Sequence, residues 1–376
     1  MLFTNAKIYT ETGWRNGSFE VTADGKFGAI SFGDQLENAI DLQNAKVIPG
    51  LIDVHIHGAM GADFSDGDPA GLKKMAQYLL KEGVTAFAPA SMTLPYPTLE
   101  KAFLVGKSLA EEDNNDCARI MGAHMEGPYF SEKKKGAQNA AYLKEPDLEG
   151  FKALYEACDG FIKIVDLAPE LPGSVAFVEG AKALCTVSIA HTDSDYDHAK
   201  AAVDAGVTHL THLYNTMPGI HHRNPGVIPA AAENQNVRAE LICDGNHVHP
   251  ASIRLAFQMF GADRMILISD ALRCCGMPNG QYELGGQTVY LNDGVGRLED
   301  GTIAGAVISL FEGMRRAITF GIDELDAIKA ATINPAKAIH ADHCIGSIET
   351  GKFADFVVCS EDYTEKRVFK GGMEIK

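Results

Sequence analysis

Residues 47–58 read Val-Ile-Pro-Gly-Leu-Ile-Asp-Val-His-Ile-His-Gly. The apolar residues of this stretch predict a buried β-strand that ends at the first histidine. Side chains two apart on a strand share a face, so His55 and His57 point the same way where the strand meets its loop. Histidine is the commonest metal ligand, and the pair begins a candidate metal site. Because His-x-His also occurs by chance, the site needs further ligands.

Composition and charge narrow the class of protein. The 376 residues are 46% hydrophobic, enough for one barrel-sized domain or two ordinary ones. The formal net charge of -17 argues against binding to nucleic acid or to an anionic membrane surface. We find no signal-peptide pattern and no run of about 18 apolar residues. The eight cysteines lack a CxxC pair, as expected in a reducing compartment. We therefore expect a cytoplasmic protein without nucleic-acid or membrane partners.

Eight short β-type runs alternate with helix-like segments through the middle of the chain, which is typical of a parallel sheet. The runs cover residues 51–57, 84–90, 119–126, 161–168, 186–191, 208–212, 238–244 and 264–270. Predicted helices include residues 69–82, 97–111, 174–184, 250–260, 307–319 and 324–339. Eight βα units close a barrel, so residues 49–343 are predicted to form a TIM-type (β/α)8 barrel of the α/β class.

The two ends of the chain carry short alternating segments separated by turns. Neither residues 1–48 nor residues 344–376 can bury a face alone, so we expect them to pair as one small β-sandwich domain formed from both termini. A third β-rich segment, residues 281–304, contains the turn signals Gly285-Gly286 and Asp293-Gly294. This predicted β-hairpin insertion follows the eighth strand, where it could cover a site at the barrel rim.

Chemistry in a TIM barrel occurs where the strands end, at their carboxyl-terminal rim. The predicted runs end in six residues of metal-ligand type: His55, His57, Glu126, His191, His212 and Asp270. Four imidazoles and two carboxylates suffice for one or two divalent ions such as Zn²⁺, Fe²⁺ or Mn²⁺. Each residue alone is more often a cap or a loop hydrogen bond. Together they would form a costly desolvated cluster unless a metal satisfied them.

Several motifs spread over nearly the whole chain are specific in combination. They are residues 49–58, His-Met-Glu-Gly-Pro at 124–128, His-Leu-Tyr-Asn-Thr-Met-Pro at 212–218, Arg-Asn-Pro-Gly at 223–226, Asp-Gly-Asn-His-Val at 244–248, Ser-Asp-Ala at 269–271 and residues 281–286. The set resembles the N-acetylglucosamine-6-phosphate deacetylase branch of the amidohydrolase superfamily. The resemblance implies hydrolysis of N-acetyl-D-glucosamine 6-phosphate to glucosamine 6-phosphate and acetate, in amino-sugar metabolism.

The resemblance also implies roles for the predicted ligands. Glu126, His191 and His212 would hold the main ion, and His55 and His57 a second one, with Glu126 bridging. Some members lack the first-strand histidines and use one ion, so the pair favours two ions here, zinc or iron with manganese as a further option. Asp270 would complete the ligand set and act as the general base, taking a proton from water and returning it to the departing amine.

Substrate contacts follow from the same resemblance. Arg223 would bind the 6-phosphate, with groups near Asn215 and Thr216 assisting, although a plain surface charge is the alternative for Arg223. His247 would contact sugar hydroxyls, and a homodimer is expected because the family completes its phosphate pocket across a dimer interface. The chain has Gln138 where many members have a histidine. Our hypothesis is that Gln138 donates a neutral hydrogen bond to the substrate carbonyl and that the second metal supplies part of the polarisation of this carbonyl.

Three alternatives stay open at this point. An N-acetylgalactosamine-6-phosphate deacetylase would differ in the reading of one hydroxyl. Cyclic amide hydrolases of the same superfamily bridge two ions with a carboxylated lysine at the end of the fourth strand. Lys163 lies early in that run, so Glu126 is the better bridge. A scaffold without activity usually loses ligands, whereas this chain retains all six.

Overall fold

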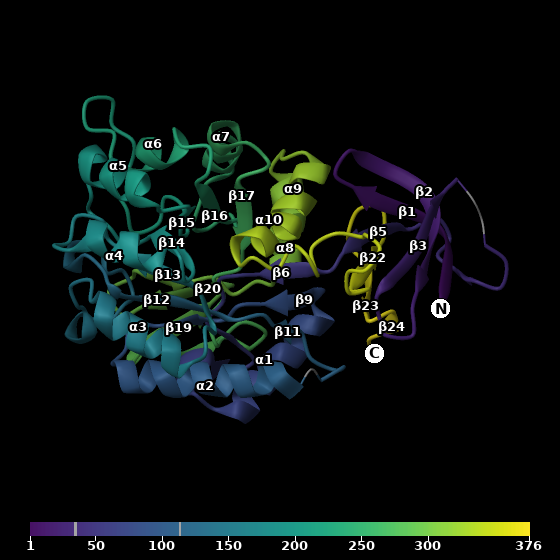
Figure 1. Cartoon of the computed structure of the whole chain (residues 1–376), viewed down its shortest axis with the longest axis horizontal. Helices are drawn as coiled ribbons and strands as arrows, with labels where there is room; N and C mark the ends of the chain where they lie inside the picture. The colour runs from purple at the N-terminus through teal and green to yellow at the C-terminus, as the bar shows by residue number, and fades with distance from the viewer. Residues whose placement is uncertain (34–35, 113) are drawn as a thin grey trace.

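The computed structural model describes residues 1–33, 36–112 and 114–376, which form a barrel and a smaller β-domain beside it (Figure 1). The β-domain carries both ends of the chain, and the barrel lies between them in sequence. Within the described residues, no helix combines the length and the apolar character that a membrane crossing requires.

The barrel strands are parallel and follow one another in chain order. Ladders join them in the orders β11-β9-β6 and β10-β12-β13-β14-β15-β16-β17. The backbone N–H of Asp270 donates to the carbonyl of His55 at 2.9 Å and so connects the segment after the last strand to the segment after the first. The predicted TIM-type α/β fold is confirmed. The strands are β6 (Leu51–Asp53), β9 (Val84–Phe87), β10 (Ala90–Ser91), β11 (Arg119–Ile120), β12 (Ala123–Tyr129), β13 (Ile162–Leu167), β14 (Thr186–Ile189), β15 (His209–Leu210), β16 (Arg238–Ile242) and β17 (Met265–Ile268).

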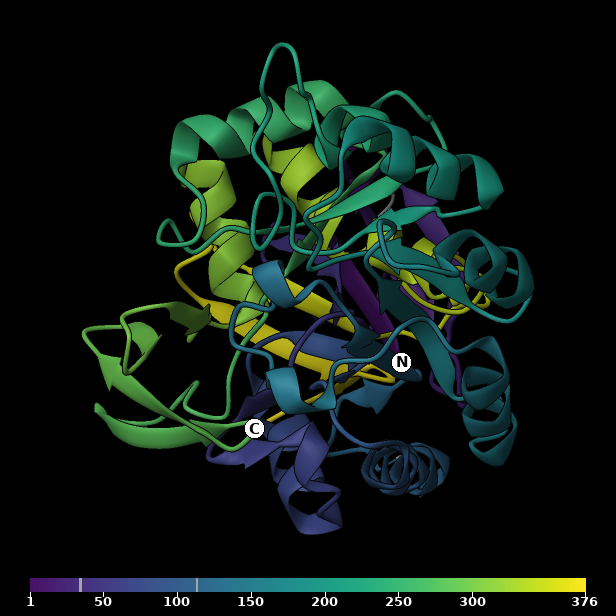
Figure 2. The same cartoon turned by 90° about the vertical axis from the view of Figure 1, so that its left-hand side faces the viewer.

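Amphipathic helices surround these strands (Figures 1 and 2). Helix α1 is representative, because Leu72, Met75 and Leu79 recur at helical spacing and are buried, while Asp68 caps its first turn. The helices are α1 (Pro69–Lys81), α2 (Tyr96–Glu112), α3 (Leu148–Ala157), α4 (Ser174–Ala181), α5 (Tyr196–Ala205), α6 (Val227–Ala232), α7 (Pro250–Phe260), α8 (Leu310–Thr319), α9 (Glu324–Ala331) and α10 (Ile333–Ala338).

The segment 324–339 forms two helices instead of the one predicted. Thr332 has φ -131° and ψ -84°, which interrupts the helix between α9 and α10. Pro335 explains the break, since its ring would clash with the carbonyl of Ala331 in a continuous helix and it has no N–H to donate.

The β-domain is formed from both ends of the chain, as predicted, and in the described residues the expected sandwich is a single eight-stranded sheet. Its order is β24-β23-β22-β5-β1-β2-β3, with β4 beside β1. Strand β22 pairs antiparallel with β5 and so links the two ends. Phe3, Phe19, Phe356 and Phe369 pack as a shared core, with the last two rings stacked 4.6 Å apart. The strands are β1 (Leu2–Thr10), β2 (Gly13–Val21), β3 (Phe27–Phe32), β4 (Ile40–Asp41), β5 (Lys46–Pro49), β22 (Phe356–Cys359), β23 (Lys366–Lys370) and β24 (Met373–Glu374).

The junction between the two parts decides which barrel end is free. Strand β5 of the β-domain leads through Gly50 directly into β6, so the amino ends of the barrel strands face the β-domain. The close fit requires glycine, because a Cβ at Gly50 would lie 2.0 Å from Oγ1 of Thr85. The carboxyl-terminal rim therefore faces away from the β-domain.

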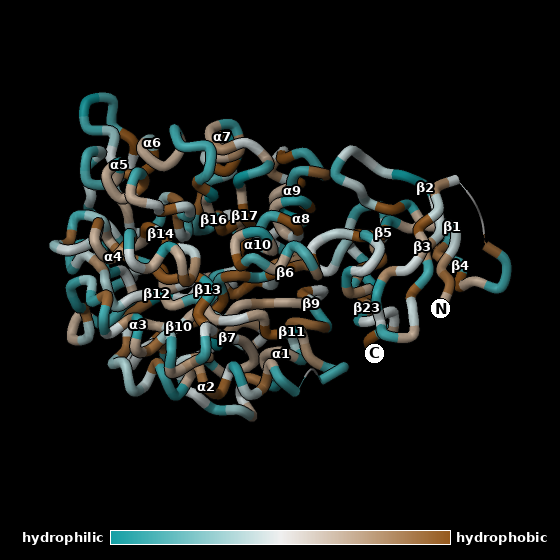
Figure 3. The backbone as a smooth tube through the Cα atoms, viewed as in Figure 1, coloured by the Kyte–Doolittle hydropathy of each residue, from teal (hydrophilic) through white to brown (hydrophobic). Residues whose placement is uncertain are grey.

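Two sets of short strands lie at this rim. A small hairpin, β7 (Gly58–Ala59) and β8 (Ala62–Asp63), directly follows the first-strand histidines. The segment predicted as an insertion forms a four-stranded antiparallel sheet, β18 (Gly280–Leu284), β19 (Gln287–Asn292), β20 (Val295–Leu298) and β21 (Ile303–Gly305), drawn in green at the left of Figure 2. Hydrophobic residues concentrate in the strands, whereas the outer loops are more hydrophilic (Figure 3).

Candidate metal centre

Six predicted ligands converge where the barrel strands end. His55 and His57 follow β6, Glu126 lies on β12, and the other three, His191, His212 and Asp270, each stand two residues beyond a strand. Those three have φ values of 45°, 31° and 48°, in the left-handed region that residues other than glycine rarely adopt. Strained backbone of this kind is concentrated at functional sites. All six residues are buried.

Glu126 lies between two pairs of histidines. Its Oε1 is 3.2 Å from Nε2 of both His191 and His212, and 3.5 Å from Nε2 of His55. Its Oε2 is 3.4 Å from Nε2 of His57. The residues thus form two groups with metal-ligand spacing, each containing one histidine pair and both sharing this carboxylate. Such an arrangement suits one or two divalent ions.

Asp270 lies beside the first-strand pair. Its Oδ1 is 3.2 Å from Nε2 of His57 and 3.7 Å from Nε2 of His55. This carboxylate is positioned to exchange a proton with a group bound next to the histidines.

Hydrogen bonds on the far side of the rings orient three of the four histidines. Nδ1 of His57 lies 3.2 Å from the carbonyl of Ala90, and Nδ1 of His191 lies 2.9 Å from that of Lys134. Nδ1 of His55 lies 2.9 Å from Oε2 of Glu240. Acceptors at Nδ1 keep the proton there and leave the Nε2 lone pair free for a metal. Nε2 of His55 is buried without a hydrogen-bond partner, which fits a metal ligand better than a member of a closed polar network.

The electrostatics of the cluster favour positive charge at its centre. Burial would raise the pKa of Glu126, but hydrogen bonds from His191 and His212, together with the nearby charge of His55, hold it well below its usual range. Burial lowers the pKa of His55, but the carboxylates of Glu240 and Glu126 outweigh it and leave the pKa well above its ordinary value. Without metal, protons would occupy the histidines, and a divalent ion would replace them.

A cavity of about 250 Å³ opens onto the cluster. Four of the predicted substrate residues line it: Gln138, Asn215, Thr216 and His247. The hairpin insertion contributes Leu284 and residues 302–305 to its wall. A larger cavity of about 930 Å³ between the β-domain and the barrel contains none of the six predicted ligands. The smaller cavity is therefore the candidate functional one, because of the two it alone opens onto the predicted metal ligands.

Gln138 contacts the cluster directly. Its Nε2 donates to Oε2 of Glu126 at 2.5 Å, and its Oε1 accepts from the backbone N–H of Thr93 at 2.8 Å. The amide is thus fixed at both ends and lies against the central carboxylate.

Arg223 lies outside the cavity. It is exposed in the segment between β15 and α6, which projects from the barrel (Figure 1), and its Nη1 lies 2.7 Å from Nε2 of His222. Within one chain, the structure does not bring Arg223 to the other predicted substrate residues.

Glu240 was not predicted. It is a buried carboxylate in the middle of β16, within the otherwise apolar run Ala-Glu-Leu-Ile, and it contacts His55. A charged residue inside a buried strand is the sequence signal that could have drawn attention to it.

The barrel and this donor set are those of the metal-dependent TIM-barrel hydrolases. The Amidohydrolase family profile matches residues 46–375, and the chain belongs to this family.

Two relatives and one solved structure are similar to nearly the whole chain. Over 358 residues the chain is 37% identical to N-acetylglucosamine-6-phosphate deacetylase from Vibrio furnissii, covering 93% of this chain and 89% of that protein. It is 33% identical over 356 residues to N-acetylgalactosamine-6-phosphate deacetylase from Escherichia coli O157:H7, covering 93% of each. Among solved structures, an Asp-to-Ala variant of the Mycobacterium smegmatis N-acetyl-D-glucosamine-6-phosphate deacetylase, in complex with N-acetyl-D-glucosamine-6-phosphate, superposes with a TM-score of 0.94. That chain is 30% identical, and the match covers 100% of this chain and 99% of that one.

Proposed function

We propose that this protein deacetylates N-acetyl-D-glucosamine 6-phosphate, giving glucosamine 6-phosphate and acetate. The observation that carries the proposal is the shared carboxylate Glu126 between two histidine pairs, next to Asp270, at the floor of a cavity. Similarity over nearly the whole chain to proteins of this activity supports the choice of substrate.

The donor set fits two divalent ions, zinc or iron with manganese as a further option. His55 and His57 would hold one ion, His191 and His212 the other, with Glu126 between them. When bound, such ions lower the pKa of water and polarise a carbonyl.

Asp270 would carry the proton through the reaction. It accepts the proton of the attacking water and returns it to the amine nitrogen as the amide C–N bond breaks, because an amine leaves poorly unless protonated. The pKa of Asp270 is suited to this role. Burial raises it, but the hydrogen bond with His57 and the charges of His55, His57 and His212 together outweigh burial and keep the carboxyl ionised at neutral pH.

The remaining cavity residues would bind the sugar phosphate. We assign the phosphate end to Asn215 and Thr216, and sugar hydroxyls to His247, whose Nδ1 is anchored by Oδ2 of Asp244 at 2.7 Å. Gln138 would offer the substrate carbonyl the N–H that Glu126 does not use. We further propose a homodimer in which Arg223 of one subunit reaches the substrate phosphate in the other subunit's cavity, and the exposure of its loop, where Ile220 is 49% exposed, is consistent with such a contact. A cytoplasmic location is proposed from the sequence pattern alone.

One residue argues against the cyclic amide alternative. Nζ of Lys163 donates to the carbonyl of Gly160 at 2.9 Å. Gly160 precedes β13, so this amine lies toward the end of the barrel opposite the metal cluster and is not placed to bridge two ions.

Acetate release from a panel of N-acetylated amino sugars, with and without a 6-phosphate and after loading with defined metals, tests the proposal. We expect the glucosamine 6-phosphate derivative to be the best substrate. Faster release from the galactosamine derivative would move the assignment to that sugar, and hydrolysis of a cyclic amide alone would overturn it.

Arg223→Ala tests the phosphate assignment in the same assay. We expect KM for the phosphorylated sugar to rise roughly 10- to 100-fold, the loss of one charge-assisted hydrogen bond. KM for the sugar without phosphate serves as the control and should stay unchanged. Equal effects on both substrates would remove Arg223 from phosphate binding.

A further inference from the structure

A buried carboxylate outside the predicted ligand set, that of Glu240, lies inside the barrel beside the metal cluster. Glu240 stands in the middle of β16, its side chain is fully buried, and it does not line the substrate cavity. Burying a carboxylate is unfavourable unless hydrogen bonds satisfy it, so its neighbours should reveal its role.

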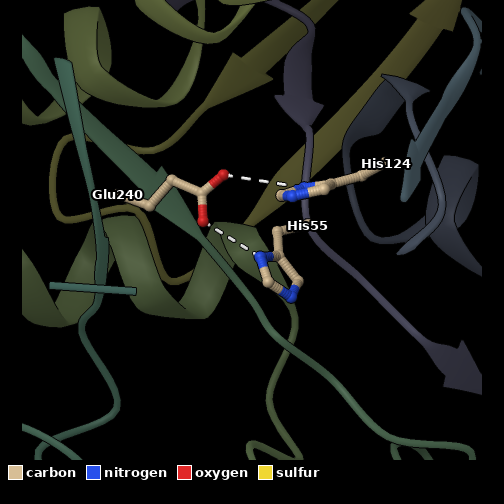
Figure 4. Close-up of side chains that lie close together, drawn as sticks. All are labelled: His55, His124 and Glu240. Carbon is tan, nitrogen blue, oxygen red and sulfur yellow. Dashed lines mark hydrogen bonds and ion pairs between the residues drawn. The ribbon is translucent and has the colours of Figure 1, made fainter. Parts of the chain in front are cut away.

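One oxygen of Glu240 contacts both histidine pairs of the metal centre. Oε2 is 2.9 Å from Nδ1 of His55, and it also accepts the backbone N–H of His212 at 3.2 Å. Figure 4 shows the His55 ring with one nitrogen directed at Glu240 and the other directed away from it. A carboxylate can only accept, so in the neutral, metal-binding form of His55 the proton must sit on Nδ1 and the lone pair on Nε2. That lone pair faces Glu126 and Asp270.

The other oxygen of Glu240 contacts a histidine outside the predicted ligand set. Oε1 of Glu240 is 2.9 Å from Nε2 of His209, whereas Nδ1 of His124 stands 3.8 Å away. His124 already contacts the carbonyl of Val54 through Nδ1 and Asp166 through Nε2. Both nitrogens are therefore in use, and the grouping of His55, His124 and Glu240 is a hydrogen-bonded support instead of a third ion site.

We propose that Glu240 is a positioning residue for the metal centre, which fixes the tautomer of His55 and holds the backbone of His212. The inference rests on the proposed two-ion site. Affinity for the ion held by His55 and His57 depends on the negative charge of a residue that touches neither ion nor substrate. The ion held by His191 and His212 depends on it less, because only a backbone N–H is involved.

Glu240→Gln tests this proposal with little change in shape. An amide that turns its NH₂ toward His55 moves the histidine proton to Nε2 and blocks metal binding there, while an amide turned the other way offers a weaker neutral acceptor. The holoenzyme is dialysed against graded chelator, and the ions that remain on each chain are counted by mass spectrometry. We expect one of the two ions, that held by His55 and His57, to lose roughly 10- to 100-fold in affinity, the usual effect of removing a carboxylate behind a ligating histidine.

Two further variants make the comparison specific. Asp166→Asn removes an equally buried carboxylate of the barrel interior that hydrogen-bonds to His124 and Thr211 but not to the four histidines of the metal centre, and its ion affinities should match wild type. Glu240→Asp keeps the negative charge but moves it one methylene away from His55, so it should lower the affinity for the same ion by a smaller factor. It takes the place of Glu240→Gln if that variant does not fold.

The outcomes separate this inference from the proposed function. Wild-type ion affinity in Glu240→Gln, or equal weakening in Asp166→Asn, would overturn the positioning role while leaving the deacetylase assignment intact. Wild-type protein that binds only one ion at saturating metal would also overturn it. Selective loss of one ion in the Glu240 variants, with circular dichroism unchanged, would support it.

Discussion

Gln138→Ala should weaken metal binding, because this amide lies against the central carboxylate. Removing the side chain deletes its hydrogen bond to Oε2 of Glu126 and leaves the N–H of Thr93 without an acceptor. A hydrogen bond to a charged group contributes about 1.5–3 kcal/mol, which corresponds to roughly 10- to 100-fold in affinity. The unsatisfied N–H adds about 1–3 kcal/mol of destabilisation to the fold, because Gln138 is buried.

Metal affinity and turnover must be measured separately for this variant. Competition with a chromophoric chelator gives the affinity, and acetate release at saturating metal gives kcat. We expect the affinity to fall by the amount above, and kcat by about tenfold, below the loss of about 10²–10³ that follows removal of a sole oxyanion donor. Gln287→Ala is the matched control, since Gln287 donates to the carbonyl of Ala137 in the same loop without reaching Glu126. An unchanged metal affinity would refute the argument that the hydrogen bond from Gln138 to Glu126 supports metal binding. An unchanged kcat would remove Gln138 from the chemistry.

Three further changes have expected outcomes. Asp270→Asn should lower kcat by about 10²–10⁴ with both ions retained, because the amide cannot accept the proton of water. Metal analysis and acetate release check this, and near-normal turnover would contradict it. In the metal-free protein the carboxylates around His55 outweigh burial and raise its pKa, so its protonation stabilises the fold below pH about 6.5 and this stabilisation disappears as the pH rises through the folded-state pKa. The melting temperature of metal-free protein should therefore fall from pH 6 to 9 relative to metal-loaded protein, and a parallel course of the two would be inconsistent with it. Glu324→Ala should reduce the free energy of unfolding by about 2 kcal/mol in chemical denaturation, because Glu324 pairs with the buried ammonium of Lys46 and so ties α9 to the β-domain. No change there would mean that this ion pair does not stabilise the junction.

Local patterns were sufficient to predict most elements of the fold. The eight β-type runs each contain a barrel strand, since apolar runs bounded by turns are a short-range property of the chain. The break at Thr332 follows from Pro335 and is also local, but the helical periodicity of 324–339 concealed it. Residues with left-handed backbone, such as His191 and His212, carry no such signal, because nothing in their composition departs from an ordinary loop.

Sequence alone determined which kinds of side chain end the strands, and hence that a metal-binding hydrolase of this family was expected. Tertiary structure decided their arrangement: Glu126 lies between the two histidine pairs, Glu240 supports His55 from behind, and Arg223 stands outside its own cavity. The physical reason is that ligand type is encoded residue by residue. Distances across a barrel depend on the stagger of strands far apart in the chain and on the turn that follows each of them.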